Sequence, residues 1–404
     1  MIRYLKNLLW HLPNSIFWNY YYGFPSKKLF LIGVTGTDGK TTTCTLLQKL
    51  LENSGLKCGI ISTISSPGLH TTSPNPKDIQ KIFSEYIKAG YTHVVCEVTS
   101  HALDQHRYWG CQFQIGILTN ISHEHLDYHR SMTRYIATKA KLLNQSRLAI
   151  LNRDDPHYQE INKLISSPKV TYSFVKKSDY QAKKITFTDK YLNFFVKHHQ
   201  YRTDSLYNYQ VLNILSALAA FDSLKLDPKI FNDTILHFPE TKGRREIVEN
   251  DSKIRTLIDF AHTPNALSET LTSLKKTTSG RLLVIFGATG GRDKSKRPIM
   301  GKNVSEIADI AFITADDTRN EKVEDINDQI ISGIDLKKTP KFKYFNIPNR
   351  QDAFNLAVKM AKSGDTIVAC GKGHETTILH GTTEYPWSEA EAFRSAFRRK
   401  TQNV

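Results

Sequence analysis

The chain has 404 residues, of which 40% are hydrophobic and 23% are charged; this excludes collagen-like, coiled-coil and wholly disordered proteins and leaves room for two or three domains. The net charge of +16 favours anionic partners, but it does not choose among nucleic acid, phosphate-rich small molecules and acidic lipid. The five cysteines are an odd number and none has C-x-x-C spacing, so we expect a reducing compartment, the cytoplasm, and neither a disulfide framework nor a cysteine zinc site.

Residues 1–28 form an aromatic and basic N-terminal arm. No apolar run in the chain reaches the ~18 residues of a membrane-spanning helix, and no small-residue cleavage site follows the arm. Two interpretations stay open: the arm contacts a membrane interface, at the inner face of the membrane, or it packs on its own domain. The residues that suggest membrane contact are Trp10, Trp18, Tyr20, Tyr21 and Tyr22, with Arg3, Lys6, Lys27 and Lys28 around them.

The next segment has the pattern of a phosphate-binding βαβ unit. An apolar run at 29–36 ends in glycine, a helical leucine pattern covers 41–55, and a second strand is expected at 57–61, which predicts a parallel sheet. The turn between them supplies glycines, backbone N–H groups, a lysine for the outer phosphates and a hydroxyl for Mg²⁺. A glycine turn with an incidental lysine is the alternative. The turn reads Gly36, Thr37, Asp38, Gly39, Lys40, Thr41 and Thr42.

Strands and helices keep alternating beyond this unit. Strands are expected at 92–98, 115–121 and 147–152, with helices at 78–90 and 132–143 between them. Short polar segments at 170–205 predict a small antiparallel patch, and a second alternating series starts near Arg245. Glu97 closes its strand and is the candidate carboxylate for the metal, although a surface glutamate is the simpler interpretation.

Several long motifs together resemble the Mur ligases, ATP-dependent amide-forming enzymes of peptidoglycan precursor synthesis. Within that family the resemblance is closest to the members that add the third amino acid. It implies an α/β fold with three parts: the arm (1–28), a central P-loop ATPase domain with a mostly parallel sheet (29–242), and a C-terminal Rossmann-like domain that binds the amino acid (243–404). The motifs lie at 33–43, 97–107, 119–129, 259–264, 286–301, 315–319 and 371–375.

The resemblance also implies roles in ATP and metal binding. Lys40 holds the β- and γ-phosphates, Thr41 and Glu97 hold one Mg²⁺, and His125 and a carbamylated Lys139 hold a second. The sequence alone would make Lys139 an ordinary helix lysine, and His123, His125 and His129 with Asp127 could suggest zinc, though in no zincin spacing. The other ATP contacts implied are the remaining loop residues, Asn213, Arg244, Asp259 and His262, the last of which could equally be a structural histidine.

Two further groups match substrate contacts of the family. The group expected to meet the sugar–peptide acceptor is Thr72, Ser73, Thr99, Gln105 and Arg107. The group expected to hold the amino acid, likened to diaminopimelate, is Asp317, Arg319, Gly371 and Glu375; an arginine suits a carboxylate and a glutamate suits an ammonium group.

The sequence departs from the family pattern in two places. Relatives carry an N-terminal domain of roughly one hundred residues that grips a uridine nucleotide, whereas about 28 residues precede the first strand here, so a lipid-linked acceptor is a second hypothesis beside a UDP-linked one. The family's D-N-P-R reads Asp316, Asp317, Thr318 and Arg319, which removes a proline and adds a carboxylate.

The expected partners are therefore a muramyl peptide and an amino acid, with no nucleic acid and a monomeric chain. A folylpolyglutamate or amino-acid polymer synthetase is the rival enzyme, because those proteins share the phosphate loop and the two-domain plan. A non-enzymatic nucleotide-binding scaffold and a nucleic-acid binder are weaker rivals, since the chain retains Lys40, Glu97 and His125 and contains no recognisable nucleic-acid module.

Overall fold

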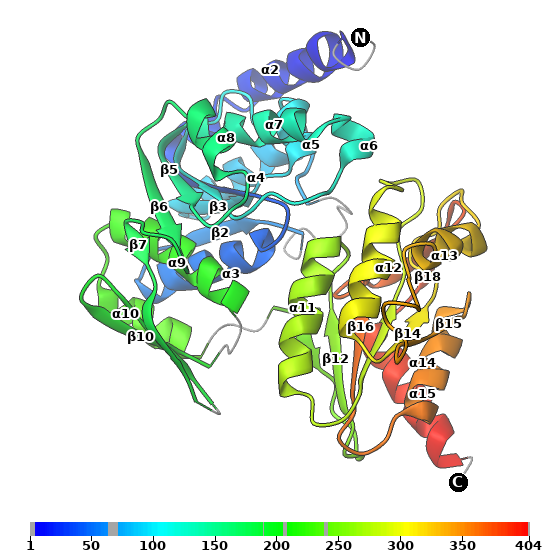
Figure 1. Cartoon of the computed structure of the whole chain (residues 1–404). Helices are drawn as coiled ribbons and strands as arrows, with labels where there is room; N and C mark the ends of the chain where they lie inside the picture. Colours follow the sequence, from blue (N-terminus) through cyan, green and yellow to red (C-terminus); the bar gives the residue numbers. More distant parts are fainter. Residues whose placement is uncertain (1–4, 64–71, 189, 205–207, 238–240, 403–404) are drawn as a thin grey trace. The chain divides into compact units, whose positions relative to one another are not determined.

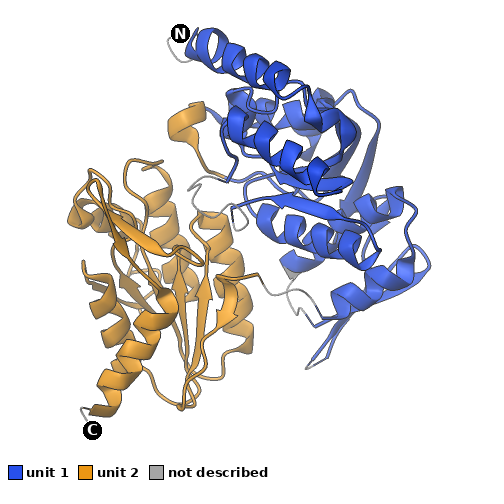
Figure 2. Cartoon of the chain, turned by 180° about the vertical axis from the view of Figure 1, so that it is seen from behind, with its two compact units in different colours: residues 1–122, 131–239 blue, residues 123–130, 240–404 orange. Residues whose placement is uncertain are grey.

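The computed structural model describes residues 5–63, 72–188, 190–204, 208–237 and 241–402. The chain forms two compact units (Figures 1 and 2): unit 1 is 1–122 with 131–239, and unit 2 is 123–130 with 240–404. The short segment 123–130 thus groups with unit 2, although the sequence-based boundaries placed it in the central domain. Residues 1–4 of the arm and 238–240 at the expected boundary lie outside the described residues.

Unit 1 is built on a parallel sheet, as the βαβ pattern predicted. Within the described residues this sheet has seven strands in the order β2-β3-β1-β4-β5-β6-β7, and every neighbouring pair is parallel. Apart from β6, discussed below, its strands are β1 (Phe30–Thr35), β2 (Cys58–Ile61), β3 (His93–Glu97), β4 (Phe113–Leu118), β5 (Ser146–Asn152) and β7 (Tyr180–Gln181).

Helices cover both faces of this sheet (Figure 1). On one face, α3 (Lys40–Asn53), α9 (Asn208–Ser223) and α10 (Pro228–Leu236) bury their apolar side chains in one hydrophobic cluster. A second cluster, on the other face, contains side chains from α4 (Pro76–Lys88), α5 (Ser100–Asp104) and α7 (Met132–Asn144). The α/β class predicted from the sequence is therefore confirmed.

One expected element of unit 1 was wrong. The segment that begins at Lys169 was placed in the antiparallel patch, but it forms β6 (Lys169–Ser173) and pairs in parallel with β5. Tyr172 explains why, because its side chain is buried and its hydroxyl donates to the carbonyls of Leu118 and Thr119 at 3.0 Å. The antiparallel patch itself is confirmed as β8 (Lys183–Phe187), β9 (Leu192–Val196) and β10 (His199–Thr203).

Unit 2 contains the second alternating series. In the described part, six strands follow the order β11-β12-β16-β13-β14-β15, and β11 is antiparallel to β12 while the other pairs are parallel. The strands are β11 (Arg244–Ile247), β12 (Arg255–Asp259), β13 (Leu282–Phe286), β14 (Ile310–Ile313), β15 (Lys343–Asn346) and β16 (Thr366–Cys370), and a hairpin of β17 (Thr377–His380) and β18 (Thr383–Pro386) follows them.

Two hydrophobic clusters cover the two faces of the unit 2 sheet. One takes side chains from α11 (Pro264–Thr277), α12 (Lys296–Ile307) and α13 (Val323–Ile331). The other takes them from α14 (Arg350–Met360) and α15 (Glu389–Gln402). This layering leaves the loops after β12, β14 and β16 at the carboxyl edge of the sheet, where open α/β sheets bind ligands.

Short elements complete the chain. A π-helical turn (Asn7–His11) leads into α2 (Leu12–Tyr21), and a 3₁₀ turn (Pro25–Lys28) precedes β1. Two short helices are α6 (Leu126–His129) and α8 (Tyr158–Leu164). Across the described ranges, we find no helix with the length and apolar character needed to cross a bilayer.

Candidate active site

The phosphate loop of unit 1 requires glycine at two positions. Gly36 has φ +150° and Gly39 has φ +81°, and a Cβ added at Gly36 would lie 1.8 Å from the hydroxyl of Thr119. A Cβ at Gly39 would lie 2.5 Å from the amide oxygen of Asn213. The structure therefore brings Asn213, from α9, against the loop at the start of α3, where backbone N–H groups suit an anion.

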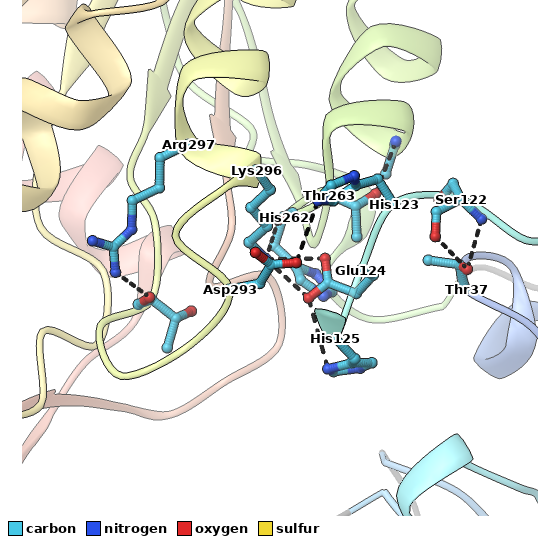
Figure 3. A network of polar contacts seen from close by, with 12 residues as sticks. Thr37, Ser122, His123, Glu124, His125, His262, Thr263, Asp293, Lys296 and Arg297 are labelled. Atoms are coloured by element: carbon cyan, nitrogen blue, oxygen red, sulfur yellow. Dashed lines mark hydrogen bonds and ion pairs between the residues drawn. The ribbon is translucent and has the colours of Figure 1, made fainter. Parts of the chain in front are cut away.

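Neighbouring loop residues hold the phosphate loop in place. The Thr119 hydroxyl donates to the carbonyl of Asp38 at 2.6 Å, and the N–H of Asp38 donates to the side chain of Asn120 at 2.9 Å. The N–H of Ser122 donates to the Thr37 hydroxyl at 2.9 Å (Figure 3). These bonds fix the backbone before any ligand arrives, which lowers the cost of orienting phosphate.

Two lysines bond to carbonyl groups of the same loop. Lys40 donates to the carbonyl of Thr37 at 2.7 Å, and Lys139 donates to the carbonyl of Gly36 at 2.6 Å. Lys139 is only 2% exposed, and its ammonium group lies 4.5 Å from the centre of the Tyr135 ring. Both predicted lysines thus lie at the phosphate loop, on the helices α3 and α7.

A carboxylate and a hydroxyl meet beside the loop. The Thr41 hydroxyl donates to Glu97 at 3.0 Å, and the Thr63 hydroxyl donates to the same oxygen at 3.2 Å. Glu97 is 2% exposed, so its charge is stabilised by these donors rather than by water. Hydroxyl and carboxylate oxygens are hard ligands, and this pair fits the requirements of Mg²⁺.

The predicted acceptor residues also come together, at the carboxyl end of β3. Arg107 donates to the Gln105 side chain at 2.7 and 3.0 Å and to the carbonyl of Ser73.

The side chain of Ser73 links this group to β3. Its hydroxyl donates to the carbonyl of Glu97 at 2.9 Å and accepts from the N–H of Thr99 at 3.1 Å. Thr72 joins them through its 3.0 Å hydroxyl contact with Thr63. Because Ser73 is buried and bonded on both sides, it positions the site rather than offering a free hydroxyl.

In unit 2, the segment 123–130 is held by buried charges (Figure 3). Lys296 is 3% exposed in its side chain and donates at 3.1 Å to both carboxylate oxygens of Glu124 and at 3.0 Å to the carbonyl of His262. His123 lies 3.4 Å from Asp293, and His125 lies 3.8 Å from Glu124.

His125 has φ +58°, so the predicted metal ligand belongs to a tightly held turn. Thr41, Glu97 and Lys139 belong to unit 1 and His125 to unit 2.

The next predicted residues lie at the start of β11 and at the end of β12 with the loop that follows it. Asp259 is 5% exposed and accepts from the N–H groups of Ala261 at 2.8 Å and Arg245 at 3.0 Å. The guanidinium of Arg244 lies 4.5 Å from the Phe260 ring centre, and the His262 ring lies 4.7 Å from it. The structure therefore brings Arg244 and His262 to one aromatic side chain, while the carboxylate of Asp259 is held by backbone N–H groups.

His374 belongs to the same aromatic group, 5.0 Å from Phe260. Burial, followed by the charges of Arg244 and Lys242, lowers the pKa of His374 to about 4, so its ring is neutral at pH 7. A Cβ at Gly243 would come within 2.1 Å of the His374 N–H. Glycine at 243 is thus what lets the strand β11 approach the loop after β16.

The predicted amino-acid residues surround a buried lysine. Lys372 is 1% exposed in its side chain and lies 2.7 Å from Asp317 and 2.5 Å from Glu375. Burial raises the pKa of Glu375 to about 7, against the opposing charge of Lys372. Gly371 has φ +109°, and a Cβ there would lie 2.7 Å from Asp316. Three of the four predicted residues, Asp317, Gly371 and Glu375, therefore lie at this one cluster.

Arg319 adds positive charge at the end of the same motif. Its φ is +52°, and its buried Nε has no hydrogen-bond partner within the described ranges. Burial, followed by the charge of Arg319, lowers the pKa of Arg292. Two guanidinium groups close enough to oppose each other favour an anionic ligand such as a carboxylate.

Sequence reasoning left several of these partners without a role. Local spacing does not show which charges become buried together, although the family motifs at 119–129, 286–301 and 371–375 contain Glu124, Asp293, Lys296 and Lys372. The only available signal was the motifs themselves, since Glu124 lies between two histidines and Lys372 lies between two glycines.

Comparisons with known proteins identify the family of this chain. The Mur ligase middle domain matches residues 34–221, and the Mur ligase, glutamate ligase domain matches residues 243–373. A curated relative, UDP-N-acetylmuramoyl-L-alanyl-D-glutamate–2,6-diaminopimelate ligase 1 of Clostridium acetobutylicum, is 36% identical over 383 residues, which cover 92% of this chain and 78% of the relative.

Two solved structures resemble the fold. A UDP-N-acetylmuramoyl-L-alanyl-D-glutamate–2,6-diaminopimelate ligase superposes with a TM-score of 0.61 at 28% identity, over 92% of this chain and 79% of its own. The folylpolyglutamate synthase of Mycobacterium tuberculosis, complexed with ADP and AMPPCP, has a TM-score of 0.71 over 89% and 92% of the two chains, but at 15% identity it shows the fold alone. The chain belongs to the Mur ligase family.

Proposed function

We propose that this protein is an ATP-dependent ligase that joins a diaminopimelate-like amino acid to a carboxylate of a muramyl peptide. The observation that carries the proposal is the 36% identity, over 92% of the chain, to a relative named for that reaction. The prebuilt phosphate loop with its Thr41–Glu97 pair supports the ATP-dependent half of the reaction. The folylpolyglutamate alternative is supported by a likeness of fold at 15% identity.

The chemistry consists of two transfers. A carboxylate oxygen of the acceptor takes the γ-phosphoryl group of ATP, and ADP leaves. The amine nitrogen of the amino acid then attacks the acyl carbon, and the tetrahedral intermediate releases inorganic phosphate and a proton as the amide forms. Such reactions depend on positioning and on charge neutralisation, because the protein itself forms no covalent bond.

The residues of unit 1 suit the first transfer. The loop N–H groups and Lys40 would hold the outer phosphates, and Asn213 would contact the nucleotide from α9. Thr41 and Glu97 would hold a magnesium ion, which neutralises phosphate charge when bound. Lys139 is buried at the loop, where its carbamate would be an anion able to bind a second ion.

Acceptor and amino acid would each use a separate group of residues. Arg107, held by Gln105, offers a positive charge beside Thr72 and Thr99 for the acceptor. In unit 2, Arg319 would hold a carboxylate of the amino acid, and Glu375 would hold its distal ammonium group. Arg244, Asp259 and His262 are the residues of unit 2 that we propose for nucleotide binding.

The test is product formation from ATP, magnesium, a panel of amino acids and either UDP-linked or lipid-linked muramyl peptide, with the product identified by mass. We expect diaminopimelate to be added, and we expect Lys40→Ala and Glu97→Ala to lower the rate by about a hundredfold or more. Lys49→Ala and Glu52→Ala are matched controls, because they remove the same charges from residues that are exposed on α3. Equal rates in Lys40→Ala and Lys49→Ala would contradict the proposal.

A further inference from the structure

The N-terminal helix has its polarity reversed. Helices on the surface of a globular protein turn apolar side chains inward and polar ones outward. Here the polar residues Asn7, Ser15 and Asn19 are buried at 6%, 0% and 0% exposure. The exposed side chains are large and apolar: Leu9 69%, Trp10 67%, Phe17 57%, Tyr20 67% and Tyr21 68%.

Specific hydrogen bonds fix this orientation. The Asn7 amide donates to the carboxylate of Asp104 at 2.7 Å and to its carbonyl at 3.0 Å. The Asn19 amide donates to the carbonyl of Trp109 at 2.6 Å. Because Asn7 and Asn19 bond to Asp104 and Trp109, rotating the helix to hide its aromatic residues would break these bonds. The outward apolar face is therefore part of how the helix attaches to the unit.

The exposed residues form one stripe, which we call the N-terminal apolar face. The stripe contains Leu9, Trp10, Phe17, Tyr20 and Tyr21, whose spacing of three, four and seven residues follows the helical repeat. Figure 1 shows α2 at the outer edge of unit 1, with the N-terminus at its far end.

Positive charges lie around this face. Residues 1–28 contain no Asp or Glu, and Lys6, Lys27 and Lys28 are exposed. Lys77 of α4 lies 5.1 Å from the Trp18 ring centre, and Lys27 lies 4.5 Å from the Phe24 ring centre. An apolar, Trp- and Tyr-rich face with lysines beside it suits the headgroup region of a bilayer that contains anionic lipid.

We infer that the N-terminal apolar face binds the surface of an anionic membrane, with α2 lying in the plane of the interface. A second copy of the chain is a poorer occupant, because pairing two such faces would bring their lysines together without an acidic partner from residues 1–28. The helix is too short to cross a bilayer, so the attachment is peripheral and salt-sensitive. The inference goes beyond the proposed ligase reaction and does not rest on it.

The experiment is co-sedimentation of the full chain with vesicles of phosphatidylcholine alone or mixed with phosphatidylglycerol. We expect binding to the mixed vesicles, and a loss of about tenfold or more in W10S/F17S/Y21S. The matched control is V175S/F187S, which removes side chains of unit 1 that are 71% and 54% exposed elsewhere. Circular dichroism melts would show that both variants fold.

The charge contribution is tested separately. K6Q/K27Q/K28Q should weaken binding to the mixed vesicles by about fivefold per lysine, and added salt should weaken the wild type similarly. K183Q/K184Q/K190Q is the control with an equal change in net charge. If both triple variants lose affinity equally, overall charge rather than this face causes the binding and the inference fails.

Two further results would overturn the inference. One is a wild-type chain that does not sediment with the mixed vesicles. The other is a concentration-dependent dimer, seen by analytical ultracentrifugation, that W10S/F17S/Y21S abolishes, since a second copy would then occupy the face. Ligation of a UDP-linked acceptor should be unchanged in W10S/F17S/Y21S, so failure of the membrane inference and failure of the proposed ligase reaction are distinguishable.

Discussion

At the scale of single residues, Glu375 makes a prediction about pH. Burial raises its pKa to about 7, while its side chain keeps 37% exposure, which leaves a route for a substrate. An ammonium group binds the ionised carboxylate and not the protonated one. We therefore expect the KM for diaminopimelate to fall as pH rises through about 7, by up to about tenfold per pH unit below the pKa, measured in steady-state assays at saturating ATP.

The variant Glu375→Gln separates this effect from ionisation of the attacking amine. The variant should show a raised KM for the amino acid without that pH dependence, whereas any dependence of kcat on the amine remains. Glu384→Gln, on the exposed hairpin strand β18, is the matched control. A KM profile of Glu375→Gln that parallels the wild-type profile would show that Glu375 does not hold the ammonium group.

The sequence predicted which residues belong to the candidate site better than it predicted which groups surround them. The glycines, lysine and threonine of the phosphate loop carry a local pattern, and they lie where the pattern requires. The environment of Asp259 could not be fully predicted, because one of the two backbone N–H groups that its carboxylate accepts from belongs to Arg245, 14 positions earlier in the chain. Likewise, nothing local to Lys372 indicates that Asp317, 55 positions earlier in the chain, would bond to it.

At the scale of elements, a buried ion pair joins the ends of two strands to two helices in unit 2. Arg350 of α14 and Glu389 of α15 are 1% and 0% exposed in their side chains. Arg350 also donates to the carbonyls of Ala315 and Cys370 at 2.9 and 3.0 Å, just after β14 and at the end of β16. The pair thus supports the loops that carry Asp317 and Lys372.

Neutralising one partner of this pair should destabilise unit 2. Glu389→Gln leaves the Arg350 charge buried without its counter-charge, and we expect a loss of about 3–5 kcal/mol in the free energy of unfolding, measured by urea denaturation. The exposed pair of Arg394 and Glu391 is the control, and Glu391→Gln should leave the free energy of unfolding nearly unchanged. Equal losses in the two variants would show that burial of the pair is unimportant.

A second contact, between Arg297 of α12 and Glu321, predicts that the stability of the fold falls in acid. Arg297 of α12 is fully buried and donates at 2.9 and 3.0 Å to Glu321, and this bonding lowers the pKa of Glu321 to about 2. A lowered folded-state pKa stabilises the fold above the ordinary pKa of about 4.5, and that stability is lost as pH falls toward about 2. The difference in urea midpoint between wild type and Glu321→Gln should therefore be large near neutral pH and shrink in this acid window.

The periodicity of apolar residues predicted which segments are helices or strands better than it predicted which strands pair. The helix expected at 41–55 forms as α3 (Lys40–Asn53), because four leucines share one buried face. The pairing of β6 was missed because its exposed Lys169 and partly exposed Val170 resemble an edge strand of either sheet. What decides the pairing is Tyr172 bonding to carbonyls more than fifty residues away, a contact that short-range patterns do not contain.

At the scale of the whole molecule, the order of elements was predictable, but the path of the chain between units was not. Alternating strands and helices correctly predicted two α/β regions. The grouping of 123–130 with unit 2 depends on Glu124 meeting Lys296, 172 positions further along the chain. Such long-range charge pairs are not encoded in local spacing, and a sequence boundary treats the chain as if each domain were continuous.

Because the net charge is +16, a measurement of nucleotide binding needs a second anion as a control. A ligand that binds only the folded chain raises its stability by about 2.7 kcal/mol at a hundred times the dissociation constant. Any polyanion would stabilise so basic a chain to some extent, but screening at about 0.15 M salt limits that effect to roughly 8 Å.

We therefore expect magnesium and ADP to raise the melting temperature in calorimetry at this salt more than pyrophosphate at equal ionic strength does. Lys40→Ala should lose the difference and Lys49→Ala should keep it, whereas an equal response to both anions would mean that the phosphate loop binds no nucleotide.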